Sequence, residues 1–475
     1  MNSPSDLRLD STPAEIAVDD LPAIPTADPT VIPTAVPTAV PIVVPIVVPS
    51  ASPDGVGAAS PYASVWPSGN ASRIPYASYV DPQLYRRELD RIFYGRHWSY
   101  VGLECEIPNP GDFKTTFVGE RAVILVRDTK GGLNVVENHC AHRGVRFCQA
   151  SHGNAKEFVC PYHQWNYDLK GNLIGLPFRR GVKVVEEGKV RVTGGMPVDF
   201  KLEDHGLTKL KVATCNGLVF ACFDHDVESF EDYVGPKVLY WIQRIFNGRQ
   251  ITLLGYSRQR IPGNWKLMQE NIKDPYHPGL LHTWFVTFGL WRADQKSQMV
   301  MDDQHRHAVM ISRRNEGGKG KVTEGVRSFK EDMSLHDARL LDVVPEAWWN
   351  GPTVTMITLF PSLIIQQQVN SVSTRHIVPR GHGEFDFVWT HFGFADDSPE
   401  MTQRRLRQAN LFGPAGFVSA DDGEVIELSQ QGFAQHPDYR TICELGGQEI
   451  GETDHSVTET LIRGMYSYWR RIMEV

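Results

Sequence analysis

The sequence lacks the features by which proteins bind nucleic acid or enter a membrane. No run of lysine and arginine stands out among its 475 residues, and the formal net charge is −8, whereas nucleic-acid-binding surfaces are basic. The most apolar stretch, residues 40–49, has proline at every fourth position and is shorter than the roughly 20 residues that span a bilayer. Residues 1–12 are polar and acidic, unlike a secretory signal. We therefore expect no nucleic-acid partner, no membrane span and no secretory signal.

Cysteine is scarce and odd in number, which excludes a disulfide scaffold. An odd set scattered over a chain of this length suits a reducing compartment, so the sequence predicts a cytoplasmic protein. Two of the cysteines belong to a metal pattern described below, and the other five are interpreted as small buried hydrophobic residues. The seven are Cys105, Cys140, Cys148, Cys160, Cys215, Cys222 and Cys443.

Residues 1–75 differ in composition from the rest of the chain. They are rich in Pro, Ala, Val, Ser and Thr and contain a near-repeat of the form IPTAVPTAVPIVVPIVVP. Such a segment favours extended polyproline II structure and cannot build a core of its own. We predict a disordered tail, and a docking arm for a partner is the alternative.

The folded sequence begins at about residue 76 and changes character along the chain. Residues 76–96 have helical periodicity, with Asp81 as a plausible N-cap. Residues 97–225 alternate short strand-like runs with Gly- and Pro-bearing turns, which predicts a small all-β domain. Residues 226–475 mix helices, expected over 229–246 and 264–290 and again in the last hundred residues, with a long antiparallel region.

The first pattern with clear chemistry pairs two cysteines with two histidines. The chain contains Cys140-x-His142 and, seventeen residues later, Cys160-x-x-His163. Each loop supplies one thiolate and one imidazole, as a Rieske [2Fe–2S] centre requires, because two thiolates bind one iron and two imidazoles the other. Gly144 fits a tight turn beside the first pair. A structural zinc ion accepts the same donor set and is the alternative.

The second pattern is a histidine pair with a nearby acid. His277 and His282 are five residues apart, and Asp274 precedes His277 by three. Residues i and i+3 share a helix face, so Asp274 and His277 can touch. A spacing of five on a continuous helix would splay the imidazoles by about 140°, but Pro278 disfavours helical geometry at His277. We expect a distorted turn that lets both imidazoles reach one ion.

Two histidines need a carboxylate to complete the facial triad of non-haem Fe(II) oxygenases, which leaves positions open for O2. The candidate lies far downstream, within residues 410–424, which include the element Phe-Gly-Pro-Ala-Gly-Phe-Val-x-x-Asp-Asp. Asp421 and Asp422 are both available as ligands. Either one also fits the N-cap of the following helix, a purely structural role.

Both patterns, in this order, resemble the large subunits of Rieske-type aromatic-ring-hydroxylating oxygenases. The two Cys/His loops, the Glu-Asn-x-x-Asp-Pro-Tyr-His-x4-His stretch and the element ending in Asp-Asp carry the resemblance, which runs from about residue 76 to the C-terminus. It implies an α+β protein with an all-β Rieske [2Fe–2S] domain over 97–225 and a helix-grip-like catalytic domain over 226–475, in which helices cover an antiparallel sheet. Residues 76–96 would be the N-terminal helix of the catalytic domain.

The resemblance also assigns residues to the two metal centres. Asp274 is not a ligand by this assignment, but links His277 to His163 of the partner subunit in a trimer and so couples the two centres. The implied assembly is a homotrimer or an α3β3 hexamer with a small β subunit. The implied ligands are Cys140, His142, Cys160 and His163 for the cluster, and His277, His282 and Asp422 for the mononuclear iron, with Asp421 as the register alternative.

One detail of the second pattern indicates a branch of the family. Two residues separate Asn271 from Asp274, and Pro275 follows, whereas dioxygenases acting on naphthalene and biphenyl carry three residues there. This form resembles the branch that acts on salicylate, anthranilate, terephthalate and halobenzoates. It implies a terminal oxygenase that hydroxylates an aromatic carboxylic acid, once or as a cis-diol. The reaction would use O2 and electrons from NAD(P)H delivered by a ferredoxin or flavin reductase.

Several alternatives stay open at the level of sequence. An aromatic carboxylate is expected to meet an arginine, because the planar guanidinium grips a carboxylate at two points, but the sequence does not choose among Arg258, Arg260, Arg292 and Arg375. The same chemistry on a neutral aromatic hydrocarbon is the second hypothesis. A zinc-binding structural protein and an electron-transfer protein without catalytic iron are hypotheses of another class, and the second pattern argues against both.

Overall fold

The computed structural model describes residues 65–66, 69–288, 295–313, 336–416 and 418–475. Most of the predicted tail, residues 1–75, lies outside this part of the chain. The chain divides into two units, Met1–Ala58 and Ala59–Val475, and the description below concerns the second unit. None of the helices in the described ranges is both long and apolar enough to cross a membrane.

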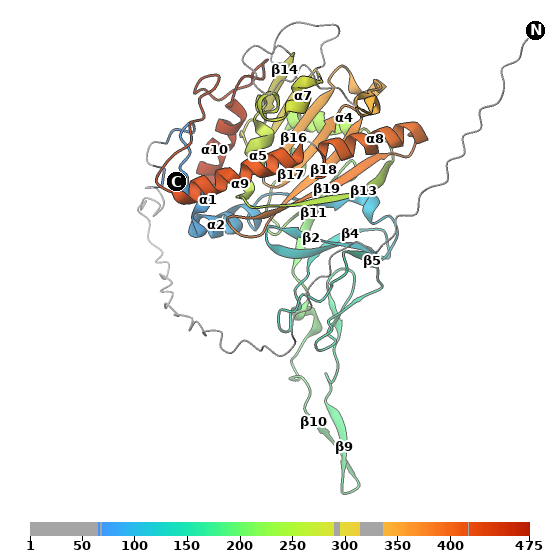
Figure 1. The fold of residues 1–475 in the computed structure, drawn as a ribbon. Helices are drawn as coiled ribbons and strands as arrows, with labels where there is room; N and C mark the ends of the chain where they lie inside the picture. The colour runs from blue at the N-terminus through green and yellow to red at the C-terminus, as the bar shows by residue number, and fades with distance from the viewer. Residues whose placement is uncertain (1–64, 67–68, 289–294, 314–335, 417) are drawn as a thin grey trace, which may run out of the picture. The chain divides into compact units, whose positions relative to one another are not determined.

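The first half of the described chain is built from short β-strands (Figure 1). Its main sheet has the order β1-β12-β11-β4-β3-β2-β5, and its core strands carry runs of branched and aromatic residues that favour extended structure. A three-stranded sheet β6-β7-β8 and a hairpin β9-β10 complete it. The bounds are β1 Ser99–Leu103, β2 Asp112–Val118, β3 Arg121–Arg127, β4 Leu133–Glu137, β5 His152–Asn154, β6 Phe158–Val159, β7 Asn166–Tyr167, β8 Leu173–Gly175, β9 Val182–Glu186, β10 Lys189–Thr193, β11 Lys209–Cys215 and β12 Leu218–Cys222.

A second, fully antiparallel sheet follows in the order β13-β19-β18-β17-β16-β15-β14. Residues of β17 and β18 are buried at every position, so both faces of the sheet are covered. The bounds are β13 Ile251–Ile261, β14 Ser297–Met301, β15 Ala308–Ser312, β16 Val354–Leu359, β17 Leu363–Gln368, β18 Ser371–Pro379 and β19 Phe385–Phe394.

The two faces of this sheet belong to two different hydrophobic cores, because side chains alternate along a strand. Met356 and Ile364 pack in a core with residues of α5 and α10. Ile357 and Ile365, one residue further along the same strands, pack in a core with α3, α4 and strands β1 and β12 of the first sheet. The face that carries Met356, called the α5 face below, is the one that bears the candidate site.

Several segments that the sequence predicts as single helices are divided in the structure, including residues 76–96, which hold α1 and α2. The segment 229–246 is two helices, because Gly235 adopts a φ of 73° between them. The segment 264–290 is three short helices rather than one, since α5 ends at Lys273 ahead of Pro275. The bounds are α1 Ala77–Val80, α2 Pro82–Glu88, α3 Phe230–Val234, α4 Pro236–Ile245, α5 Trp265–Lys273, α6 Pro278–Leu281, α7 Thr283–Thr287, α8 Pro399–Phe412, α9 Ser419–Gln435 and α10 Thr460–Met473.

These elements confirm the predicted α+β class, with a β-rich first half and an antiparallel sheet covered by helices in the second. Asp81 is the N-cap of α2, as predicted, and its carboxylate accepts hydrogen bonds from the backbone N–H of Gln83 and Leu84. A π-helical turn, Leu89–Phe93, extends α2.

A fully buried ion pair ties the N-terminal helix to α5 and α10. The Lys266 ammonium lies 2.6 Å from Glu88 Oε1, and both side chains are 0 % exposed. The indole N–H groups of Trp265 and Trp469 donate to the same carboxylate at 2.8 and 2.7 Å. Burial lowers the pKa of Lys266, and the charge of Glu88 opposes that shift. The carboxylate therefore accepts from three buried donors, two at Oε1 and one at Oε2.

Replacing Glu88 with alanine should destabilise the protein by about 3–5 kcal/mol, because it leaves a buried ammonium without its counter-ion and two indole donors without partners. The measurement is unfolding by denaturant or heat. The double change Glu88→Leu with Lys266→Met should recover much of the loss, since neither charge then remains buried. An unchanged unfolding midpoint for Glu88→Ala would show that water or another acid replaces the carboxylate.

Candidate metal centres and substrate pocket

The two Cys/His loops fold into the same tight turn. In the first loop, Cys140 N–H donates to the carbonyl of Val145 and Gly144 N–H donates to the carbonyl of Cys140. In the second loop, Cys160 N–H donates to Trp165 and Gln164 N–H donates to Cys160. Gly144 and Gln164 hold equivalent places, with φ of 72° and 53°. The predicted turn at Gly144 is therefore present, and each loop presents one cysteine and one histidine.

The four side chains are arranged as a cysteine pair and a histidine pair. The imidazole rings of His142 and His163 lie 4.6 Å apart between centroids. Burial raises the pKa of the Cys160 thiol, and the neighbouring Cys140 thiol, in hydrogen-bond contact with it, adds to that effect. This pairing matches two thiolates on one iron and two imidazoles on another.

A compact zinc site would look different. Four ligands about 2.0–2.3 Å from one zinc ion lie within about 4 Å of one another. Within the described ranges, no three of these four cysteine and histidine side chains bring their ligand atoms within 4.8 Å of each other. The donor set and its spread therefore fit a two-iron cluster better than a single zinc ion.

Two aromatic residues that the sequence did not single out support the cluster loops. The Tyr167 hydroxyl lies 3.2 Å from Cys140 Sγ and accepts from the backbone N–H of Ala141. The Trp165 ring stacks on the His142 ring, with an interplanar angle of 2° and centroids 4.8 Å apart. Both follow the second loop at alternate positions, so strand periodicity could have suggested that they share one face.

The second pattern is brought together where α5 ends. Asp274 ends α5 in an extended conformation, and its Oδ1 accepts from the backbone N–H groups of Tyr276 and His277 at 3.2 Å each. Asp274 and His277 therefore touch, as their spacing predicted. The expected distorted turn is present, but it lies at Asp274 and Pro275; the prediction that Pro278 disturbs His277 is wrong, because His277 keeps helical angles (φ −56°, ψ −34°). The turn redirects the chain before α6, so that the rings of His277 and His282 lie 5.5 Å apart.

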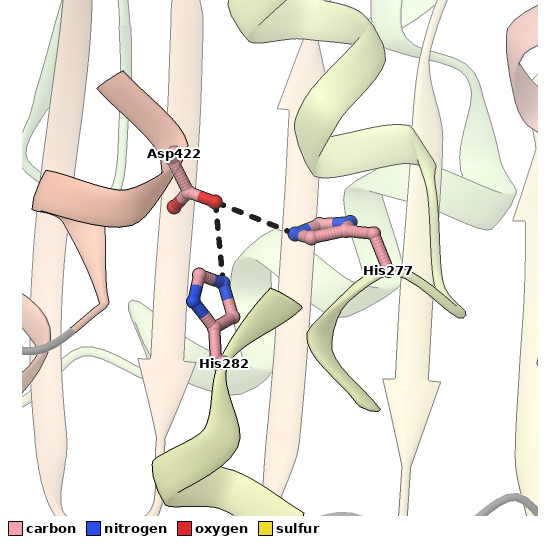
Figure 2. A group of neighbouring side chains, drawn as sticks. All are labelled: His277, His282 and Asp422. Atoms are coloured by element: carbon pink, nitrogen blue, oxygen red, sulfur yellow. Dashed lines mark ion pairs between the residues drawn. The ribbon is translucent and has the colours of Figure 1, made fainter. Parts of the chain in front are cut away.

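Asp422 completes a group of three potential ligands (Figure 2). Its Oδ1 lies 3.4 Å from His277 Nε2 and 3.2 Å from His282 Nε2. The three ligand atoms all lie within 4.8 Å of one another, and His282 and Asp422 are buried. Two imidazoles and one carboxylate on one side of an ion are the donor set of the facial triad.

The structural alternative for the two aspartates is wrong. Helix α9 begins at Ser419 with Val418 as its N-cap, so Asp421 and Asp422 lie inside the first turn and cap nothing. The helix starts earlier than the sequence indicates, and this turns the Asp422 carboxylate toward the two histidines.

Each of the three side chains also has a hydrogen-bond partner outside the group of three. The Nδ1–H group of His277 donates to the Asp274 carbonyl at 2.8 Å, and that of His282 donates to Asp421 Oδ2 at 3.1 Å. Asn271 donates to Asp422 Oδ1 at 3.1 Å. Both imidazoles therefore direct Nε2 toward Asp422, and the contacts of Asn271 and Asp421 are ones that the sequence did not assign.

The electrostatics of the site follow from these contacts. Burial opposes a charge on His277, but hydrogen bonds and the negative charges of Asp274 and Asp422 raise its pKa to about 10. Burial would raise the pKa of Asp422, but the two histidines hold it far below its usual range. Without a metal, the group is an ion pair.

A largely apolar pocket opens on the α5 face of the sheet, beside the triad. His277, His282 and Asp422 are part of its wall. Strand register explains the rest, since β14–β18 turn the same alternate side chains toward it. The apolar lining consists of Ile272, Pro275, Pro278, Phe285, Met299, Met310, Val354, Met356 and Val418. Such a wall fits a flat aromatic ring.

Arg375 is the one arginine or lysine among the described residues that line this pocket. Its side chain is 4 % exposed, its Nε has no hydrogen-bond partner, and its guanidinium lies 3.8 Å from the centroid of the Trp389 ring. Burial lowers its pKa to about 9, and the charge of Asp422 opposes that shift. The guanidinium therefore stays charged at neutral pH without a carboxylate of its own.

The other three candidate arginines are placed differently. Arg258 is exposed, and Arg260 is paired at the surface with Asp386. Arg292 lies outside the described residues. Among the described candidates, only Arg375 reaches the pocket beside the triad.

Two family models match the chain. Residues 97–186 match the Rieske [2Fe-2S] domain, and residues 248–475 match the catalytic domain of the ring hydroxylating alpha subunit. The four cluster-loop residues lie in the first match and the triad in the second.

The chain is also similar to curated proteins over most of its length. It is 70 % identical to the large oxygenase component of salicylate 5-hydroxylase from Ralstonia sp, over 86 % of this chain and 96 % of that protein. It is 41 % identical to the large subunit of anthranilate 1,2-dioxygenase from Burkholderia cepacia, over 86 % and 95 %. Among solved structures, naphthalene 1,2-dioxygenase from Rhodococcus sp. bound to indole has the same fold, with a TM-score of 0.70 at 22 % identity over 84 % and 94 % of the two chains.

The affinity of the triad for Fe2+ should rise with pH. His277 has a pKa of about 10 without metal, so at neutral pH the metal must displace one proton. Below that pKa, each added pH unit should strengthen binding about tenfold. Anaerobic competition with a chelator between pH 6.5 and 8.5 measures this slope. Affinity that does not change with pH would show that His277 is neutral before metal binds.

Proposed function

Because the chain belongs to the family of ring-hydroxylating oxygenase alpha subunits, we propose that it is the terminal oxygenase for salicylate, which it hydroxylates once, at the 5-position. It is an iron-dependent oxidoreductase that hydroxylates an aromatic carboxylic acid, and it carries a Rieske [2Fe–2S] cluster and a mononuclear non-haem iron. The choice of salicylate rests on the 70 % identity to a salicylate 5-hydroxylase component.

The observation that favours an acid over a neutral hydrocarbon is the unpaired charge of Arg375 in the pocket. A cation buried without a counter-ion costs free energy, which a bound carboxylate would offset. The fork of the guanidinium can donate two parallel hydrogen bonds to that carboxylate. The contact of the guanidinium with the Trp389 ring, 3.8 Å from its centroid, restricts the movement of the fork, so the anion would be held in place while the apolar wall contacts the ring.

We propose that two groups of side chains hold the two metal centres. Cys140, His142, Cys160 and His163 would hold the cluster, and His277, His282 and Asp422 the mononuclear iron. When bound, the cluster transfers single electrons and the mononuclear iron activates O2. The protein's own share is to bind and orient the acid, to exclude water with the apolar wall, and to keep both imidazoles in the tautomer that leaves Nε2 free for metal.

We further propose that electrons pass between subunits through Asp274. Among the described residues of one chain, no hydrogen bond or ion pair joins Asp274 to His142 or His163, whereas its carbonyl binds His277 directly. Asp274 lines an open cavity, and Tyr162, next to His163, is 58 % exposed. His163 of the partner subunit would enter that cavity, which suits a homotrimer, alone or with a small β subunit.

The proposed enzyme also needs an electron donor. The names of the relatives describe large components of multi-component enzymes, and we propose a ferredoxin or flavin reductase as the electron donor, with NAD(P)H as the source. We place the Rieske domain at 97–225 and the catalytic domain at 226–475, with 76–96 as part of the latter. We propose the cytoplasm as the location of the protein, since none of the seven cysteines, all of which lie in the described ranges, forms a disulfide.

Replacing Arg375 with methionine should weaken binding of salicylate by about 2–5 kcal/mol, at least about 30-fold, because the substrate carboxylate then loses its buried partner. Substrate affinity and KM with the electron donors supplied are the measurements. Arg260→Met removes a surface arginine and should leave KM within about twofold.

The comparison with an uncharged analogue sharpens this test. The unmodified enzyme should prefer salicylate strongly over salicylamide, and Arg375→Met should lose most of that preference. A variant that keeps both the KM and the preference would show that another residue binds the acid. Failure of the unmodified enzyme to hydroxylate any aromatic acid would overturn the proposed function itself.

Changing Asp274 to alanine should lower product formation by about 100-fold while both iron centres stay loaded, since the carboxylate that would meet His163 of the partner subunit is lost. The specific readout is the rate at which O2 and substrate oxidise the reduced cluster, followed by stopped-flow absorbance. Both variants keep the backbone carbonyl that accepts from His277. Asp274→Asn also keeps a side-chain acceptor oxygen, so its rate should fall between those of the alanine variant and the unmodified enzyme. A rate equal to that of the unmodified enzyme would remove Asp274 from the electron route.

A further inference from the structure

The two neighbouring aspartates in the first turn of α9 contact opposite edges of the same imidazole. Asp422 Oδ1 lies 3.2 Å from His282 Nε2, and Asp421 Oδ2 lies 3.1 Å from His282 Nδ1. Consecutive residues on a helix point about 100° apart, so both carboxylates cannot face one ion. Asp422 faces the position where the metal would bind. Asp421 contacts the opposite edge of the His282 ring.

The contact of Asp421 differs from the one behind the other histidine. His277 Nδ1–H donates to a neutral acceptor, the Asp274 carbonyl, whereas His282 Nδ1–H donates to a carboxylate. A charged acceptor makes a stronger hydrogen bond, and it increases the electron density that the opposite nitrogen offers to a metal. The Asp274 carboxylate lies 3.9 Å from His277 Nδ1, beyond hydrogen-bond distance. The two imidazoles of the triad therefore differ in the group that accepts a hydrogen bond from Nδ1, and only His282 has a carboxylate there.

The burial of His282 and the position of Asp421 at the start of α9 favour the contact between their side chains. The His282 side chain is 1 % exposed, so its ring has few other partners, while the Asp421 side chain is 40 % exposed and can approach the ring from outside the pocket. Asp421 lies in the first turn of a 17-residue helix, where the helix dipole stabilises negative charge. In the described part of the chain, its carboxylate makes no other hydrogen bond or ion pair.

We propose that Asp421 is a positioning residue that acts through His282 and sets both the affinity of the mononuclear site for Fe2+ and the donor strength of that histidine. The proposal rests on the proposed function only in requiring a metal at the triad. Its consequence is that Asp421 and Asp422 have different tasks, with Asp422 binding the ion and Asp421 holding the imidazole that binds it.

The test compares metal binding in the full-length protein with its cluster intact and the mononuclear metal removed. Asp421→Ala should weaken Fe2+ binding about 10- to 100-fold, and Asp421→Asn, which keeps an acceptor but loses the charge, should weaken it by a smaller factor. The matched control is Glu424→Gln, which removes the same charge from an exposed position of the same helix. It should change affinity by less than about twofold.

A second readout separates positioning from general destabilisation. With Co2+ in place of iron, the visible ligand-field bands should shift in Asp421→Ala and Asp421→Asn, because the donor strength of His282 has changed. The bands should not shift in Glu424→Gln. Cluster absorbance and the thermal midpoint report folding. If the alanine variant does not fold, the asparagine variant decides the outcome on both readouts.

The proposal is overturned if Asp421→Ala, or the asparagine variant in its place, binds Fe2+ as tightly as the unmodified protein with unshifted Co2+ bands. It is also overturned if Glu424→Gln loses as much affinity, since charge alone and not the contact would then matter. Unmodified protein that binds no Fe2+ at the triad while its cluster is intact would instead contradict the proposed function, and this inference with it.

Discussion

The site depends on the end of a helix. If α5 continued through His282, a spacing of five residues would point the two imidazoles about 140° apart. The chain leaves helical geometry at Asp274, the residue before Pro275, and has regained it at His277, so both rings meet Asp422. The same break exposes the Asp274 carbonyl to His277 Nδ1. One local departure from the helix therefore gathers the ligands and fixes a tautomer.

The second sheet supplies the environment of that site. Strict alternation along its strands sends one set of side chains to the core shared with α3 and α4 and the other set toward α5. Because Arg375 pairs with Ile364 and Trp389 in register, it falls on the α5 face with the pocket and the triad. A one-residue slip would move it to the opposite core. Substrate recognition thus follows from strand pairing as much as from the residue itself.

The local motifs of the two candidate metal centres could be predicted from the sequence. The contacts between distant parts of the chain could not be predicted from spacing alone. The Cys/His loops and the histidine pair are local, so their spacing alone indicated metal binding. Asp422 lies far along the chain, and only a resemblance to known oxygenases placed it with His277. The choice of Arg375 required strand register and burial, which four isolated arginines do not reveal. The N-cap role for Asp421 or Asp422 was wrong because α9 starts at Ser419, and helix starts are set by packing as well as by capping residues.

The central claim is that one polypeptide encodes two separate iron centres, and metal analysis tests it most directly. Protein purified and loaded without oxygen should contain about three irons and about two acid-labile sulfides per chain, as a [2Fe–2S] cluster plus a mononuclear site requires. The His282→Ala variant should retain about two irons and all of the sulfide. Protein that holds zinc in the Cys/His loops, or that lacks sulfide after careful anaerobic reconstitution, would contradict the account.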